Sequence, residues 1–98
     1  MKALLSRMPG GPGTLELADV PDPVAGPGEL LVRIAFCAIN YPDVLVIEDK
    51  YQFKPPRPFA PGSEVSGTVE AVGKGVEGWA GGDRLLAPTG AAGGLAEK

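Results

Sequence analysis

The fold of this 98-residue chain is decided by one stretch of its sequence, Gly28-Glu29-Leu30-Leu31-Val32-Arg33-Ile34-Ala35-Phe36-Cys37-Ala38-Ile39-Asn40. Side chains alternate along residues 29–40, so that one face carries Leu30, Val32, Ile34, Phe36 and Ala38. The other face carries Arg33, Ala35 and Cys37. A repeat of two residues is that of a half-buried β-strand. We therefore expect the longest strand here, with its first face in the core and Arg33 in solvent.

Shorter strand patterns lie on both sides of this stretch. They cover residues 1–6, 14–20, 64–72 and 83–87. The first two flank a turn of prolines and glycines, which predicts a hairpin. Gly67 interrupts the third pattern and is expected to mark a bulge or a bend. Short strands separated by turn residues predict a mainly β fold, either a small β-barrel or an open Greek-key sheet.

One short helix is expected directly after the longest strand. Apolar side chains recur at helical spacing within residues 41–50, Pro42 suits a first helical turn, and Asp43 suits its positive end. We expect residues 1–87 to form one domain. Residues 88–98 are small and glycine-rich and are expected to be a tail that leads to a missing strand, so that the domain is incomplete.

The composition excludes several classes of protein. The 9 basic residues are scattered singly among 12 acidic ones, and the net charge of −3 argues against binding to nucleic acid. No apolar stretch is long enough for a membrane span or a signal peptide. A single Cys cannot form an internal disulfide, which fits a reducing cytoplasm. With no His and one Cys, the chain lacks the usual ligands of zinc, so no metal is expected.

A glycine motif at residues 73–78, Gly-Lys-Gly-Val-Glu-Gly, has the spacing of a dinucleotide-binding turn. That function needs a helix to begin at the motif, because the pyrophosphate binds to the amide groups at a helix N-terminus. The residues that follow, Trp79-Ala80-Gly81-Gly82-Asp83, do not favour a helix. We therefore expect a turn between two strands, and no dinucleotide there.

The junction between the longest strand and the helix is the first candidate site. Asn40 offers an amide, Tyr41 a phenol and Asp43 a carboxylate, and such groups at a strand end can meet a ligand. The same residues can instead cap the helix, with Tyr41 packed on the surface. From the residues alone both interpretations stay open.

Three other residues have a structural interpretation beside any functional one. Glu64 is either a solvated strand end or a buried carboxylate that orients a neighbour. Cys37 is expected to be a small buried residue, because no cationic neighbour in sequence would lower its pKa. Tyr51 is by default an aromatic residue that anchors a loop or the core.

Residues 29–43, residues 61–73 and the turn Gly82-Asp83-Arg84 together resemble the N-terminal domain of the medium-chain dehydrogenase/reductase superfamily. That domain has a chaperonin-10-like (GroES-like) fold. Its pattern is a strand led by Gly-Glu, a Gly-x-Glu turn with a Gly-x-Val-x-x-Val-Gly strand, and a Gly-Asp-Arg turn. The resemblance extends from Met1 to about Ala87, in the order and spacing of the family.

The resemblance narrows to one branch through residues that are missing. Zinc alcohol dehydrogenases of this superfamily have a Cys, a His and a hydroxyl-bearing residue at the positions of Asn40, Tyr41 and Pro42, and a His at Ser63. The chain is therefore similar to the zinc-independent quinone oxidoreductases, which include zeta-crystallin-like proteins. This implies hydride transfer from NADPH to a quinone or an activated enone, whose conjugated system spreads the incoming charge. A cleft tyrosine of some quinone reductases is Leu45 here.

The same resemblance implies roles for single residues. Asn40 is the expected catalytic residue, through an amide contact near the nicotinamide or the acceptor oxygen, and is also the expected cofactor contact. Tyr41 and Tyr51 are expected to bind the acceptor. The residues expected to support them from the cleft floor are Asp43, Ser63 and Glu64.

The whole protein is expected to be a cytoplasmic homodimer that binds a small-molecule acceptor. A separate nucleotide-binding domain, absent from this chain, is expected to hold most of the NADPH, so that the 98 residues alone are inactive. An enoyl-thioester reductase and a stand-alone GroES-like binding module are the alternatives.

Overall fold

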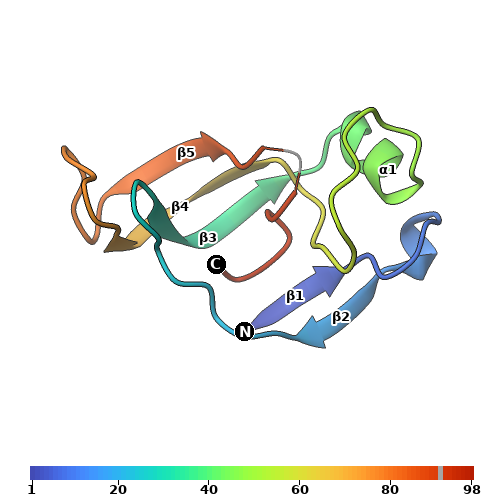
Figure 1. Ribbon diagram of the computed structural model, residues 1–98, viewed down its shortest axis with the longest axis horizontal. Coiled ribbons are helices and arrows are strands. Elements are labelled where there is room, and N and C mark those ends of the chain that lie inside the picture. Colours follow the sequence, from blue (N-terminus) through green and yellow to red (C-terminus); the bar gives the residue numbers. More distant parts are fainter. Residues whose placement is uncertain (91) are drawn as a thin grey trace.

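A computed structural model describes residues 1–90 and 92–98 (Figure 1). In chain order the elements are β1 (Lys2–Leu5), the 3₁₀ turn η1 (Pro12–Thr14), β2 (Glu16–Asp19), β3 (Leu30–Ala38), α1 (Tyr41–Ile47), β4 (Glu64–Val72) and β5 (Arg84–Pro88). β1 and β2 form an antiparallel hairpin, and β3, β4 and β5 form an antiparallel sheet with β4 in the middle. The predicted mainly β fold with one short α-helix is confirmed. No helix in the described residues is long and apolar enough to cross a membrane.

β3 is nine residues long, the same length as β4, and its side chains change face halfway along, which corrects the expected pattern. Ile34 pairs with Gly67 and Phe36 pairs with Ser66, so Ala35 has no partner on β4. An extra residue of this kind is a β-bulge, and it turns the later side chains to the other face. Phe36, which was expected in the core, is therefore 77% exposed. Gly67 lies opposite the bulge, as expected. Glycine suits this position, because a Cβ there would collide with the backbone of β3.

The glycine motif of residues 73–78 lies between two paired strands. β4 ends at Val72, and β5 runs back along it in antiparallel register from Thr68↔Arg84 to Glu64↔Pro88. Residues 73–83 are turns and irregular backbone, so no helix begins at the motif. This confirms the expected strand–strand turn.

The last residues of the chain connect the two sheets (Figure 1). We call residues 93–98 the C-terminal strap. Its backbone pairs with β1, because the Leu4 N–H donates to the Leu95 carbonyl oxygen at 2.9 Å. It also meets β3, where the Ile34 N–H donates to the Glu97 carbonyl oxygen at 2.9 Å. The strap thus lies between the hairpin and the three-stranded sheet.

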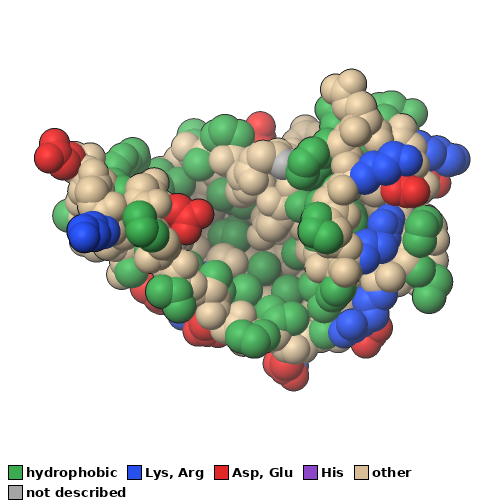
Figure 2. All heavy atoms as spheres, viewed as in Figure 1, with side chains coloured by type: hydrophobic (Ala, Val, Ile, Leu, Met, Phe, Trp, Pro, Cys, Tyr) green, Lys and Arg blue, Asp and Glu red, His purple; other side chains and the backbone are tan. Residues whose placement is uncertain are grey.

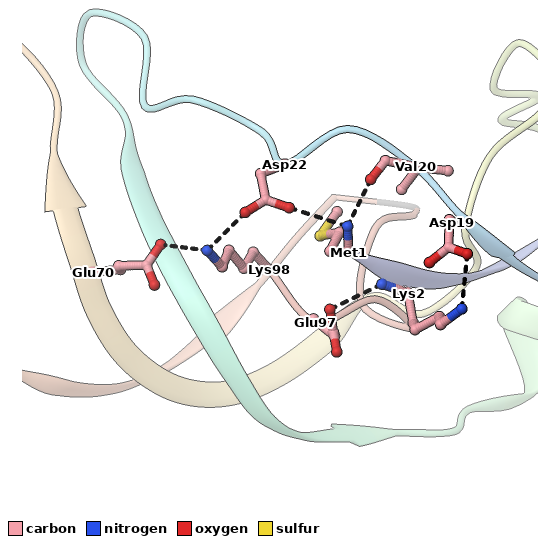
Figure 3. A network of polar contacts seen from close by, with 8 residues as sticks. All are labelled: Met1, Lys2, Asp19, Val20, Asp22, Glu70, Glu97 and Lys98. Carbon is pink, nitrogen blue, oxygen red and sulfur yellow. Dashed lines mark hydrogen bonds and ion pairs between the residues drawn. The ribbon is translucent and has the colours of Figure 1, made fainter.

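Lys98 fixes the end of the strap through charge (Figure 3). Its ammonium lies 3.0 Å from the carboxylate of Asp22 and 3.0 Å from that of Glu70 on β4. Asp22 also accepts a hydrogen bond from the N-terminal amine of Met1 at 3.1 Å. One carboxylate therefore joins both ends of the described chain to the loop that follows β2.

The fully buried core is small. One cluster packs Val46 and Ile47 of α1 against Phe59. Elsewhere, Ala3 and Leu5 of β1 and Val65 and Val69 of β4 are buried. In the space-filling view the middle of the molecule is hollowed, and hydrophobic side chains lie in the hollow (Figure 2). The two sheets therefore form an open structure and not a closed barrel.

Candidate active site

The strand register brings two chain segments to the same end of the sheet. Ala38, the last residue of β3, is the partner of Glu64, the first residue of β4. The chain that leaves β3 toward Asn40 and the chain that enters β4 through Ser63 therefore meet at this end. Five of the six predicted site residues belong to these two segments. They are Asn40, Tyr41, Asp43, Ser63 and Glu64.

Asp43 holds Asn40 in place at the start of α1. The Asp43 carboxylate accepts a hydrogen bond from the backbone N–H of Asn40 at 2.8 Å. In return, the Asn40 carbonyl oxygen accepts one from the backbone N–H of Asp43 at 3.0 Å. Asp43 is 6% exposed, and its charge lies at the positive end of the helix. The helix-capping interpretation of Asp43 is therefore correct, and the cap fixes the backbone of Asn40.

The side chains around this cap point outward. Asn40 is exposed, and the neighbouring Ile39 and Tyr41 are each 74% exposed. An amide between two large apolar side chains can donate to and accept from a ligand while the ligand's flat faces contact its neighbours. The junction can thus serve as a binding surface as well as a helix cap.

The second segment is fixed by the C-terminal part of the chain. The Thr89 N–H donates to the Ser63 carbonyl oxygen at 2.9 Å, and the Thr89 hydroxyl donates to the Gly62 carbonyl oxygen at 2.9 Å. The Gly94 N–H of the strap also donates to the Gly62 carbonyl oxygen at 2.9 Å. Ser63 is half-buried, whereas Glu64 is exposed. Glu64 is therefore a solvated strand end.

Cys37 lies behind the site, in a position that the sequence did not indicate. A Cβ atom on either Gly62 or Gly94 would lie 2.6 Å from the Cys37 Sγ, so the thiol fills a slot between two glycines. Burial is the main cause that raises the pKa of Cys37, and the charge of Asp43 and then that of Glu64 add to it. At neutral pH the protonated thiol is therefore favoured, and it packs against both glycines. No local pattern could reveal this slot, because Gly94 is distant in sequence.

Tyr51 lies in a different environment from the other predicted residues. It is half-buried and packs against the cluster of Val46, Ile47 and Phe59. Its contacts are therefore with the core beside α1. Its expected contact with the acceptor stays a prediction.

An apolar groove begins at the same end of the sheet. It has a volume of about 590 Å³ and crosses the outward-facing side of β3, β4 and β5. Its lining includes Phe36, Ala38, Glu64, Ser66, Leu86 and Pro88. Within the described residues, no group of three or more Cys, Asp or Glu side chains is placed to hold a metal ion.

Comparison with known proteins gives consistent results. Residues 26–97 match the family described as the alcohol dehydrogenase GroES-like domain. Over 99% of its length the chain is 35% identical to the quinone oxidoreductase of Lama guanicoe, and it covers 30% of that protein. The chain spans between 19% and 30% of the length of the first curated relatives that it matches.

Solved structures agree with these relatives. The human synaptic vesicle membrane protein VAT-1 homolog-like protein is similar with a TM-score of 0.93 and 35% identity, over 99% of this chain and 31% of that one. The quinone oxidoreductase from Thermus thermophilus, solved also in complex with NADPH, is similar with a TM-score of 0.79 and 38% identity, over 99% of this chain and 28% of that one.

Proposed function

Because the chain belongs to the alcohol dehydrogenase GroES-like domain family, in the quinone oxidoreductase-like branch of the medium-chain dehydrogenases/reductases, we propose that it forms the acceptor-binding side of an NADPH-dependent oxidoreductase. The acceptor is a quinone or an activated enone, and the whole protein is a cytoplasmic homodimer. The proposal is carried by one observation, the exposed Asn40 amide at the sheet end, whose backbone N–H is held by the buried Asp43 carboxylate at 2.8 Å.

The side chains at the junction fit one end of the cofactor. The donor and acceptor of the Asn40 amide match the carboxamide of a nicotinamide or the oxygen of an acceptor. The turn at residues 73–78 connects two antiparallel strands and offers no helix N-terminus for a pyrophosphate. The nucleotide part of NADPH therefore needs a separate nucleotide-binding domain. We propose that these 98 residues alone do not catalyse the reaction.

When bound, NADPH supplies the hydride. Asn40 then orients the acceptor and donates a hydrogen bond to the oxygen on which negative charge develops. Tyr41 offers a flat, exposed ring for a planar acceptor, and Tyr51 supports the cleft from the cluster beside α1. Asp43 fixes the backbone of Asn40, and Ser63 and Glu64 lie on the neighbouring segment at the same end of the sheet. These three residues position Asn40 and do not contact the reacting atoms.

The reaction is proposed to be independent of zinc. The chain has no His and one Cys, and the Cys37 thiol is packed between Gly62 and Gly94 with a raised pKa. A protonated thiol is a poor metal ligand, because metals bind the thiolate. A conjugated acceptor reduces the need for a Lewis acid, because its π system takes up the charge that zinc would otherwise stabilise.

The test uses the complete open reading frame that contains this chain. We expect the protein encoded by it to oxidise NADPH with a quinone or an enone as acceptor. We expect the 98-residue chain to oxidise NADPH with neither acceptor. Asn40→Ala should lower kcat/KM by about 100- to 1,000-fold, the range for loss of one hydrogen bond to developing charge. The matched control is Gln52→Ala, which removes an exposed amide outside the site and should leave kcat/KM unchanged.

Four results would each contradict a part of the proposal. An unchanged kcat/KM in Asn40→Ala would remove Asn40 from the site. A zinc content near one per chain would refute the zinc-independent reaction. Turnover of an enoyl thioester, with none of quinones, would instead support the enoyl-thioester reductase. Failure to bind NADPH at all would support a binding module without enzymatic activity.

A further inference from the structure

The chain between α1 and β4 is irregular, so side chains must hold it in place where no helix or strand does. We call residues 48–63 the α1–β4 connection, which runs past the end of β1 on its way to β4 (Figure 1). Its prolines have no N–H to donate, which limits backbone hydrogen bonding within it. The connection carries Tyr51, one of the residues that the proposed function places at the acceptor. Whatever fixes the connection therefore bears on how the acceptor binds.

Phe59 anchors the later part of the connection. It is 8% exposed and packs with Val46 and Ile47 of α1 in the buried cluster. Its backbone pairs with that of Ser6. The Ser6 N–H donates to the Phe59 carbonyl oxygen at 2.8 Å, and the Phe59 N–H donates to the Ser6 carbonyl oxygen at 3.3 Å. Tyr51, near the start of the connection, packs against the same cluster, so its position depends on how Ile47 and Phe59 are held together.

Arg57 joins Ile47 to Phe59. Its Nη2 donates a hydrogen bond to the carbonyl oxygen of Ile47, the last residue of α1, at 2.9 Å. Its guanidinium carbon lies 5.2 Å from the centroid of the Phe59 ring, within the range of a cation–π interaction. A cation near the C-terminus of a helix also suits the negative end of the helix dipole. One side chain thus ties the connection to the helix and to the core residue that supports Tyr51.

The environment of Arg57 is costly for a charged group. Among residues 1–90 and 92–98, its buried Nε has no hydrogen-bond partner and its guanidinium belongs to no ion pair. Atoms of the described chain already enclose Nε, so a further domain could not supply the missing partner. A buried donor without a partner lowers stability, whereas an apolar side chain of similar length would fill the space without this cost. Stability of the fold alone therefore does not account for an arginine here.

We propose that Arg57 is a positioning residue for the acceptor, because it fixes the α1–β4 connection and, through it, Tyr51. The inference rests on the proposed function, since it concerns how Tyr51 meets the acceptor. Arg57 itself does not touch the acceptor or the reacting atoms. Loss of its guanidinium lets the connection move, which weakens acceptor binding equally before and during hydride transfer. Such a change raises KM for the acceptor and leaves kcat unchanged.

The kinetic test uses the protein encoded by the complete open reading frame, with NADPH and phenanthrenequinone as substrates. Arg57→Met keeps the length of the side chain and removes its charge and its donors. It should raise KM for the quinone at least about fivefold, with kcat and KM for NADPH within about twofold of wild type. Arg57→Lys keeps the charge and a donor, so it should raise KM for the quinone less than Arg57→Met does. The matched control is Lys54→Met, which removes an exposed cation of the same connection and should change none of these constants.

Limited proteolysis of the same protein gives a readout that does not depend on activity. Trypsin cleaves after Lys50, but not after Lys54 or Arg57, because proline follows each of these two residues. Arg57→Met therefore removes no cleavage site. It should speed cleavage at the exposed Lys50 at least about threefold, since a segment with weaker local contacts opens more often. Lys54→Met should be cleaved there at the wild-type rate.

The proposal is overturned if KM for the quinone is unchanged in Arg57→Met, or if Lys50 is cleaved no faster than in wild type. A fall in kcat together with a rise in both KM values would also overturn it, because that is the pattern of a damaged fold. Circular dichroism checks folding, and Arg57→Gln, with the same expected values, is used if Arg57→Met does not fold. If the wild-type protein reduces neither quinones nor enones, the proposed function fails, and the cleavage rates alone decide whether Arg57 fixes the connection.

Discussion

Replacing Asp43 by Asn tests whether the buried carboxylate fixes the start of α1. The Asn side chain can still accept a hydrogen bond from the Asn40 N–H, so the variant removes the charge and keeps the geometry. A charge-assisted hydrogen bond is about twice as strong as a neutral one, which predicts a loss of about 1 kcal/mol. Loss of a negative charge at the helix N-terminus adds about 0.3–1 kcal/mol. We therefore expect the free energy of unfolding to fall by about 1–2 kcal/mol.

The same variant has a second and independent effect on Cys37. The negative charge of Asp43 helps to hold the pKa of this thiol above its ordinary value of 9.0. In Asp43→Asn the pKa of Cys37 should therefore fall, and it should stay above 9.0, because burial is the larger cause and does not change. The single thiol of the chain makes this measurable from the pH dependence of its reaction with a thiol reagent.

Guanidinium chloride unfolding measures the first effect, and Asp49→Asn is the matched control. Asp49 is exposed, follows the other end of α1, and has a φ of 63°, which Asn tolerates well. Within the described residues 1–90 and 92–98 its one ion pair is a 3.7 Å contact with Lys54, so the free energy of unfolding should change by less than about 0.5 kcal/mol in Asp49→Asn. Equal effects of the two variants, or a Cys37 pKa that rises in Asp43→Asn, would refute the role assigned to Asp43.

Two further predictions concern the sheet and the strap. Gly67→Ala should lower the free energy of unfolding by about 1–3 kcal/mol, because the new Cβ would meet the β3 backbone and the Val32 side chain. Gly11→Ala, with open space around it, should not be destabilising. Equal effects of the two variants would contradict the close approach of Gly67 to β3. The hydrogen bond to Lys98 lowers the pKa of Asp22. The contribution of ionised Asp22 to stability is therefore present above pH 3.8 and is lost as the pH falls through the pKa of Asp22 in the folded protein. Hydrogen bonds to Asp22 and Glu70 raise the pKa of Lys98. The contribution of charged Lys98 to stability is therefore present below pH 10.5 and is lost as the pH rises through the pKa of Lys98 in the folded protein. In Lys98→Met the melting temperature should therefore decline less steeply toward both acid and alkaline pH, whereas Lys54→Met should keep the wild-type profile. Identical profiles for the two variants would argue against the role of the Lys98 ion pairs with Asp22 and Glu70.

Those parts of the fold that depend on neighbouring residues could be predicted from the sequence. β4 extends over residues 64–72 as predicted, because an alternating pattern between turn residues is a local signal. The Asn40–Asp43 cap was one of two open interpretations, and it also depends on a spacing of three residues. The face of Phe36 was predicted wrongly, because the bulge at Ala35 depends on how closely Gly67 of another strand approaches.

The location of Tyr51 shows the same limit for the candidate site. Its position in sequence, soon after α1, is compatible with the cleft and with the core. In the structure Tyr51 contacts the cluster of Val46, Ile47 and Phe59, and Phe59 follows an irregular, proline-rich connection, while the contact of Tyr51 with the acceptor stays a prediction. Sequence patterns describe regular elements, so they carry no information on where such a connection returns.

The strap explains why small residues with no packing pattern matter for the site. Gly93 and Gly94 have no side chains to bury, yet their N–H groups donate to the carbonyl oxygens of Ala60 and Gly62 at 2.7 and 2.9 Å. These bonds hold the segment that leads into Ser63 against the Cys37 thiol, where a Cβ on Gly94 would not fit. Every residue except proline can donate a backbone hydrogen bond, so the positions of these bonds are not encoded by side-chain type. The position of Ser63 relative to Asn40 is therefore set by the absence of side chains, because only glycine allows the strap to approach this closely.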